Sequence, residues 1–241
     1  MRRDEILSAL FPGGWSITDR DDALMLGTGT MASGGTVHVV GIEQGKALGV
    51  DGAIILAGHV LRIVEEGGRD PLLVMIDTKG QRMSRRDEML GLNEYLAHLA
   101  KTILLASRSG HPTIGLVHGK AAAGAFLATA LATDLLLALP QAEPAVMDLP
   151  SIARVTKLPE DQLKRMARST PIFAPGVDPM YGIGAIETIL DLDGDLAAQF
   201  EEALGRVDGR DMRDETGLER GGRRLAAMIS RKVIARVRDA R

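Results

Sequence analysis

The sequence contains no cysteine, which excludes disulfide bonds and cysteine zinc sites. Aromatic residues make up only 3% of the 241 residues, so few side chains are available for stacking on nucleic-acid bases. The sequence also has no excess of positive charge: it contains 29 Lys and Arg and 32 Asp and Glu, which gives a formal net charge of −3. A dedicated nucleic-acid-binding protein is therefore not expected.

Long apolar runs are equally scarce. The longest, residues 121–139, is interrupted by Thr129, Thr133 and Asp134, so no membrane span is expected. Residues 1–15 lack the apolar core and the small-residue cleavage site of a signal peptide. We therefore expect a cytoplasmic protein with an aliphatic core.

What is present is an alternation of strand and helix patterns. Residues 23–43 predict two strands joined at Gly34-Gly35. Apolar periodicity predicts two helices and continuous apolar runs predict three buried strands: helices 48–66 and 85–107, and strands 72–77, 113–118 and 135–139. A helix of small residues is expected to run through Ala132. This alternation is typical of βαβ crossovers and an α/β fold.

After Pro140 the sequence predicts short helices separated by prolines. They are expected over 148–157, 159–169, about 195–204 and 223–237, with a short apolar segment at 184–190. We interpret residues 1–241 as a single domain with a core over about 20–190. A helical extension follows over about 191–241.

Two predicted strands end in glycine-bearing turns, residues 76–81 and 117–124. Ligands collect at the carboxyl ends of parallel strands, and small side chains leave main-chain N–H groups uncovered. The second turn also begins a helix, whose N-terminus favours negative charge. Paired N–H groups form an oxyanion hole worth roughly 3–4 kcal/mol per donor in the transition state. Close packing of helix on sheet explains the same small residues equally well.

Both turns resemble those of a known family. GKAAAGAF (residues 119–126) resembles the GKAYGGAY turn of biotin-dependent carboxyltransferases in the crotonase superfamily, and DTKGQ (residues 77–81) lies where these have DTPGF. Over about residues 20–205 the sequence resembles the gamma subunit of biotin-independent malonate decarboxylase. The resemblance implies a crotonase-like ββα spiral, in which residues 184–186 correspond to a Gly-Leu-Val segment after the active-site helices.

This resemblance implies an enzyme subunit that acts with a homologous beta subunit, as a heterodimer or heterotetramer. The pair decarboxylates a malonyl thioester carried by an acyl carrier protein on a phosphoribosyl-dephospho-coenzyme A arm. The N–H groups of Ala123 and Gly124 are expected to hold the departing carboxyl group, with Gly80 and Gln81 as the opposite wall. No metal, no biotin and no cofactor bound by this chain alone are expected.

Gly119, Lys120 and Lys79 are the residues expected at the substrate. Lys120 fits either a phosphate of the arm or a solvated lysine at a helix start. Two positions depart from the family: Ala123-Gly124 replaces two adjacent glycines, and Lys79-Gly80 replaces Pro-Ser. An N–H donor survives both changes.

For two further side chains, His118 and Asp77, the sequence allows both a catalytic and a structural role. His118 fits a proton donor to the product enolate or a strand-end histidine bonded to the backbone. Asp77 fits a turn carboxylate that accepts from nearby N–H groups better than a general base. The spacing of the five histidines, His38, His59, His98, His111 and His118, indicates no metal site.

The tail, residues 217–241, carries eight Lys and Arg and two acidic residues, with an aliphatic stripe at four-residue steps. It fits a docking helix for an acidic carrier protein, or a solvated helix that packs through its stripe. Two other functions remain open: half of a biotin-dependent acyl-CoA carboxyltransferase, and a structural subunit that completes its partner's site. A Clp-like serine protease is excluded, because residues 121–125 contain no serine.

Overall fold

The computed structural model describes residues 1–169, 174–222 and 224–239. Residue 223, where the last helix was expected to begin, lies outside these ranges, as do residues 170–173 and 240–241. No helix among the described residues is long and apolar enough to cross a membrane.

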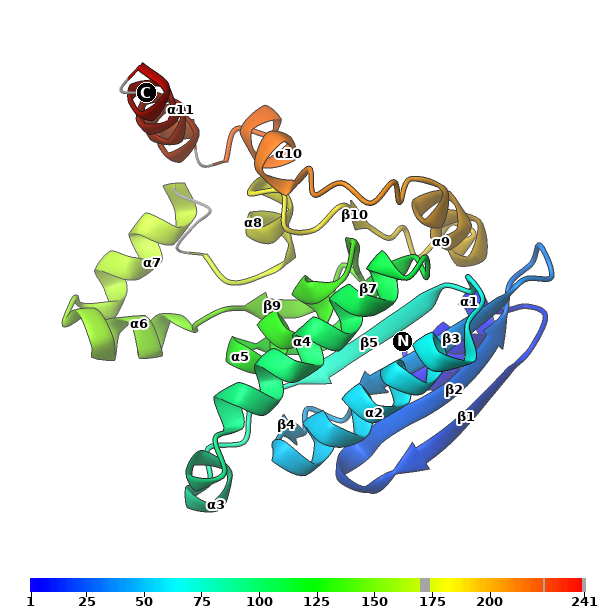
Figure 1. Cartoon of the computed structure of the whole chain (residues 1–241). Helices are drawn as coiled ribbons and strands as arrows, with labels where there is room; N and C mark the ends of the chain where they lie inside the picture. The colour runs from blue at the N-terminus through cyan, green and yellow to red at the C-terminus, as the bar shows by residue number, and fades with distance from the viewer. Residues whose placement is uncertain (170–173, 223, 240–241) are drawn as a thin grey trace.

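One mixed sheet forms the centre of the molecule (Figure 1). Its order is β1-β2-β3-β5-β7-β8-β10, with β9 paired to β7. The bounds are β1 (Trp15–Arg20), β2 (Leu24–Thr30), β3 (Thr36–Ile42), β5 (Leu72–Thr78), β7 (Thr113–Ala122), β8 (Leu135–Ala138), β9 (Glu143–Ala145) and β10 (Thr188–Ile189). The first three strands pair antiparallel, and the pairs from β3–β5 onward are parallel. The predicted α/β class is confirmed.

A second, two-stranded sheet pairs β4 (Ala47–Leu48) with β6 (Gly80–Gln81) in parallel. Because β6 follows β5 after a single residue, this small sheet fixes the first predicted turn beside the carboxyl end of the main sheet. It therefore gives the Gly80-Gln81 backbone a defined position.

Helices cover both faces of the main sheet. On one face α2 (Val50–Glu66) and α4 (Leu92–Arg108) contact each other over a core with α5 (Ala123–Ala128). On the other face α1 (Arg3–Leu10) packs with α9 (Leu196–Gly205), and Phe11 meets Phe200 edge-on at 5.9 Å. Burial of these apolar faces stabilises the fold by roughly 25 cal/mol per Å².

Most predicted elements are present, and the differences have local causes. The helix over 48–66 is confirmed as α2 and ends at Gly67, whose φ of +77° suits glycine. The helix over 85–107 is two helices, α3 (Arg85–Met89) and α4, because Gly91 turns the backbone at φ +80°. The helix through Ala132 ends at Ala128 and is followed by a 3-10 turn, η2 (Ala130–Ala132).

Three expectations about boundaries are corrected. The chain does not open with sheet at residue 23, because α1, β1 and the 3-10 turn η1 (Asp21–Ala23) come first. The strand over 113–118 continues to Ala122, because β9 pairs with its last residues. Helix α9, expected in the extension, buries Phe200 in the core, so the core reaches beyond residue 190.

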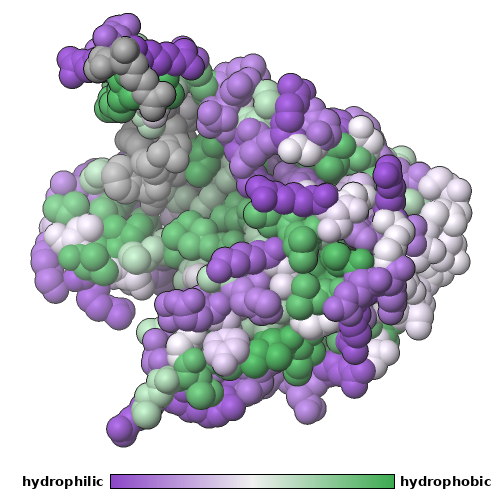
Figure 2. Space-filling view, viewed as in Figure 1, coloured by the Kyte–Doolittle hydropathy of each residue, from purple (hydrophilic) through white to green (hydrophobic). Residues whose placement is uncertain are grey.

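The remaining helices follow β9. Helix α8 (Val177–Gly182) packs against β9 and β10 and buries Val177 and Met180 in the core. The others are α6 (Leu149–Thr156), α7 (Glu160–Ser169), α10 (Arg213–Glu219) and α11 (Arg224–Asp239). Figure 1 shows α6, α7 and α11 projecting from the body, and Figure 2 shows hydrophobic side chains exposed on this side. Helix α11 has no buried residue among those described, so its own chain gives it little tertiary support.

Candidate active site

Asp77, near the end of β5, joins the loop after β3 to the last part of β7. One carboxylate oxygen accepts from the Gly45 N–H at 3.1 Å, and the other accepts from the Lys120 N–H at 2.9 Å. The predicted turn-forming role of Asp77 is thus seen directly. With both oxygens accepting main-chain hydrogen bonds, Asp77 stabilises the loops and is not arranged as a general base.

Gly119 is required by this arrangement. A Cβ atom at residue 119 would overlap the Asp77 carboxylate, so a larger residue would displace the group that joins the loops. This packing explains the glycine without substrate contact, and a substrate-binding role for Gly119 stays a prediction.

The two predicted turns touch each other. Gly80 is buried at φ +116°, and a Cβ there would lie 3.3 Å from the Ala122 oxygen and 3.5 Å from the Ala123 Cβ. Residues 43 positions apart in the sequence therefore form one site at the edge of the sheet, with β6 against the start of α5.

Two of the four expected main-chain donors are satisfied within the chain. The Gly124 N–H donates to Oε1 of Gln81 at 2.9 Å, and the Gly80 N–H donates to the Thr78 hydroxyl at 3.2 Å. The expected pair of free N–H groups at Ala123 and Gly124 is therefore corrected: within the part of the chain that the structure describes, only the Ala123 N–H of this pair is left without an acceptor. Helix α5 begins there, so the Ala123 N–H has no acceptor earlier in the helix.

Gln81 supplies a second main-chain donor. The Arg82 N–H points to β4 and donates to the Leu48 oxygen at 2.8 Å. Since successive residues of a strand alternate in direction, the Gln81 N–H points away from β4, toward the side of β6 that α5 contacts. The Ala123 and Gln81 backbones thus lie on the same side of β6, where the two turns meet.

Ala123 has an unusual backbone conformation. Its φ is +52°, the left-handed region in which glycine is favoured. This explains why two adjacent glycines are typical of the family at residues 123–124. Alanine here keeps the N–H donor at a cost of roughly 1–2 kcal/mol in backbone strain.

We expect Ala123→Gly to raise the free energy of unfolding by about 1 kcal/mol, because relief of strain exceeds the added entropy of the unfolded chain. Ala125→Gly in the same helix, where φ is not positive, is the matched control and should lower stability by about 1 kcal/mol. Urea denaturation measures both. Destabilisation by Ala123→Gly would contradict the strain at residue 123.

His118 is held in its neutral form. Burial lowers the pKa of His118 to about 4, although nearby Asp77 acts in the opposite direction. Among the described residues its Nε2 atom has no hydrogen-bond partner, so the expected bond to the backbone is corrected for this atom. A neutral imidazole is a weak acid at neutral pH, which argues against His118 as the proton donor.

His118 should make the fold sensitive to acid. An unfolded histidine has a pKa of about 6.5, so between pH 6.5 and 4 the unfolded chain binds a proton that the folded chain excludes. The free energy of unfolding should therefore decrease as the pH is lowered from 6.5 to 4, by up to about 3 kcal/mol. We expect His118→Phe to flatten the dependence measured by urea denaturation at pH 7 and 4.5. Identical slopes for both proteins would refute this role.

The two candidate lysines are both exposed and lie next to the site. Lys79 lies between Thr78 and Gly80, and Lys120 precedes the last residues of β7. The Lys120 N–H donates to Asp77, and no ion pair of either lysine side chain forms within residues 1–169, 174–222 and 224–239. The structure thus leaves both side chains available at the rim of the turns, as a substrate-binding role requires.

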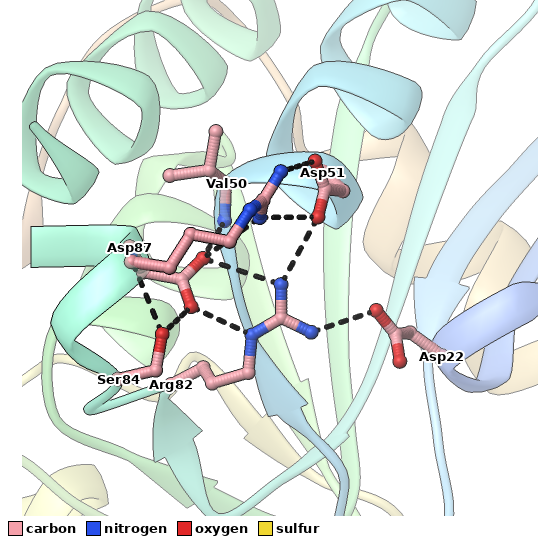
Figure 3. A network of polar contacts seen from close by, with 7 residues as sticks. Asp22, Val50, Asp51, Arg82, Ser84 and Asp87 are labelled. Carbon is pink, nitrogen blue, oxygen red and sulfur yellow. Dashed lines mark hydrogen bonds and ion pairs between the residues drawn. The ribbon is translucent and has the colours of Figure 1, made fainter. Parts of the chain in front are cut away.

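Sequence reasoning missed a polar network directly after Gln81 (Figure 3). The Asp87 carboxylate, 1% exposed, accepts from Arg82 Nε at 2.9 Å, the Val50 N–H at 2.9 Å and the Ser84 hydroxyl. These interactions hold the pKa of Asp87 well below its usual range, with the Arg82 hydrogen bond as the largest cause. The pattern Ser84-x-x-Asp87 before a helix is the signal that predicts such a cap. The network fixes the backbone that leads out of the Gly80-Gln81 turn.

The parallel core sheet, with two touching glycine turns at the ends of β5 and β7, defines a crotonase-like fold. Transcarboxylase 12S has the same fold, with a TM-score of 0.68 at 19% identity over 85% of this chain and 40% of that chain. The family described as malonate decarboxylase gamma subunit matches residues 43–237. The chain therefore belongs to this family, as the resemblance over about residues 20–205 predicted.

Individual similar proteins support the same family assignment. Malonyl-S-ACP:biotin-protein carboxyltransferase MADD of Malonomonas rubra is 29% identical over 216 residues, which are 82% of this chain and 70% of that protein. A chain of the Pseudomonas malonate decarboxylase hetero-tetramer in complex with coenzyme A is 26% identical, with a TM-score of 0.78 over 96% of this chain and 97% of that chain. The Pseudomonas MdcD–MdcE hetero-dimer gives 25% identity and a TM-score of 0.75 over 95% and 96%.

Proposed function

We propose that this chain is the gamma subunit of a malonate decarboxylase, which removes CO2 from a malonyl thioester on an acyl carrier protein together with a homologous beta subunit. The observation that carries the proposal is the contact between the two turns at one edge of the sheet, where we expect the Ala123 and Gln81 N–H groups to serve as donors. Family membership supports the same reaction.

The reaction needs donors more than it needs reactive side chains. When the bond between the malonyl carboxyl carbon and Cα breaks, its electron pair moves into the thioester as an enolate, and CO2 leaves. The negative charge gathers on the thioester oxygen, and each N–H group aimed at it contributes roughly 3–4 kcal/mol in the transition state. Protonation of the enolate carbon then gives the acetyl thioester. No group in the two turns is required as a nucleophile.

Lys79 and Lys120 support binding of an anionic substrate. Both are exposed beside the turns, where their charge attracts the malonyl carboxylate or a phosphate of the carrier's arm. We include Gly119 in the proposed substrate site, because its backbone places Lys120 at the same edge of the sheet. The substrate enters as a thioester on its carrier, so the chain itself holds no cofactor in this proposal.

A partner subunit fits the exposed apolar surface at the C-terminal end. Six apolar side chains of α11 are 44–71% exposed: Leu225, Met228, Ile229, Val233, Ile234 and Val237. Val146, Met147 and Val155 are exposed as well, near or on α6, on the side that Figure 2 shows as hydrophobic. Apolar surface of this extent is typical of a protein interface. The beta subunit is the proposed occupant, as hetero-dimers and hetero-tetramers are known for the similar Pseudomonas enzyme.

Helix α11 also carries five Lys and Arg against one Asp. Two copies of this chain would bring like charges together, which disfavours a symmetric homodimer through this helix. The charge instead favours a partner whose apolar groove has acidic residues at its rim. The expected docking role of the tail is part of this proposal.

The second candidate is transfer of the carboxyl group to biotin, because the similar MADD protein is a malonyl-S-ACP:biotin-protein carboxyltransferase. One assay separates the two. The purified complex of this chain, the beta subunit and malonyl-loaded carrier should release CO2 in the presence of avidin, which sequesters biotin. Release only when a biotinylated acceptor is supplied would replace decarboxylation by carboxyl transfer. No release under either condition would refute both.

A further inference from the structure

The side chain of Gln81 has a donor that the chain does not use. Its Oε1 accepts from the Gly124 N–H at 2.9 Å. A main-chain N–H is only a donor, so the atom facing Gly124 must be the oxygen, and the NH2 group must point elsewhere. Over residues 1–169, 174–222 and 224–239, no acceptor bonds this NH2 group.

From this geometry we infer that the Gln81 carboxamide is a catalytic donor, whose NH2 group hydrogen-bonds the thioester oxygen as it becomes the enolate oxygen. The inference rests on the proposed decarboxylation and assigns one residue to it. Gly124 is then a positioning residue. Its N–H holds the oxygen of the Gln81 carboxamide, and the NH2 group of the same carboxamide donates to the substrate.

Two features prepare Gln81 for this role. The hydrogen bond from Gly124 draws electron density toward Oε1 and makes the NH2 group a stronger donor, because hydrogen bonds in series polarise one another. A Cβ at residue 124 would lie 3.3 Å from Oε1 and 3.5 Å from Leu96 Cδ1, so glycine leaves room for the carboxamide. The side chain is thus held in place before substrate arrives.

The backbone of Gln81 is fixed on both sides. Gly80 and Gln81 pair with β4, and the following residue, Arg82, is held by the buried Asp87 carboxylate. A donor preorganised in this way lowers the barrier without reorganisation during the reaction. The position is more rigid than a glutamine on a free loop would be.

Steady-state CO2 release by the assembled complex tests the inference with two variants. Gln81→Ala removes the donor and frees the Gly124 N–H. Gln81→Glu keeps an oxygen for Gly124 but replaces the donor with an acceptor. We expect each to lower kcat at least about 100-fold, with KM changed less than about threefold, since the bond strengthens only in the transition state.

Gln141→Ala, at an exposed glutamine in the turn after β8, is the matched control and should keep wild-type kcat. Thermal unfolding and gel filtration show that the variants fold and assemble. Wild-type or faster turnover by Gln81→Ala would overturn the inference, since the side chain would then merely cover the Gly124 N–H. A rise in KM alone would also overturn it and place the carboxamide at the substrate carboxylate. An inactive wild-type complex would instead refute the proposed reaction itself.

Discussion

Asp87→Ala should lower the free energy of unfolding by about 2–3 kcal/mol, because it removes hydrogen bonds to a buried charged group and leaves a main-chain N–H without its acceptor. The Asp87 side chain is 1% exposed, and its carboxylate joins Arg82, Ser84 and the start of α2 at Val50. Removal leaves the Val50 N–H and one edge of the Arg82 guanidinium without their acceptor. Few other single changes outside the apolar core should cost as much.

Asp51→Asn is the matched control for this prediction. Asp51 also accepts from Arg82, but its side chain is 50% exposed, so its removal should cost less than about 1 kcal/mol. Urea denaturation of both variants gives the comparison. A loss below about 1 kcal/mol for Asp87→Ala would show that the network does not stabilise the turn.

The same carboxylate sets a pH limit. Because the folded pKa of Asp87 lies below its usual value near 3.9, its contribution is fully present above about pH 4 and is lost as the pH falls toward the folded pKa. This window lies below the one expected for His118, so the two effects can be separated by titration.

Ile229→Glu combined with Val233→Glu should weaken binding of the beta subunit at least about 100-fold, because charges would replace apolar contacts at the centre of the interface. These side chains are 56% and 55% exposed on α11, a helix with no buried residue among those described. Since both are exposed in the isolated chain, the substitutions should leave its own stability within about 0.5 kcal/mol.

The matched control for the interface is Leu104→Glu with Leu105→Glu on α4, where both side chains are 43% exposed. Titration calorimetry with the beta subunit should give wild-type affinity for this control and a severe loss for the α11 variant. Equal affinities of the α11 variant and the wild type would place the interface elsewhere.

Local pattern predicted the elements whose burial is periodic. Helix α2 and strand β5 were predicted with nearly correct bounds, because their apolar residues repeat at 3.6 residues or run continuously. Helix α1 was missed, since it has only eight residues and ends two residues before Pro12. Tertiary contacts hold it in place, because Ile6, Leu7 and Leu10 are buried in the core that α1 shares with α9.

The candidate site was predicted in its location but not in its bonding. Glycine spacing located both turns at strand ends, and the family resemblance paired them. The bond between Gln81 and Gly124 joins residues 43 positions apart, and no local pattern encodes such a contact. Because this bond occupies the Gly124 N–H, the donor proposed for the substrate is the NH2 group of Gln81 and not the Gly124 N–H.

The central claim is that donors held by these two turns stabilise the enolate. Gly124→Pro tests it most directly, because it removes the N–H group that holds the Gln81 carboxamide, at the second residue of α5, where the first turn of a helix tolerates proline. Gly124→Ala keeps that N–H and serves as the control. In the assembled complex we expect the proline variant to lower kcat at least about 100-fold, while the alanine variant stays within about tenfold of wild type. Wild-type turnover by an assembled Gly124→Pro complex would contradict the account.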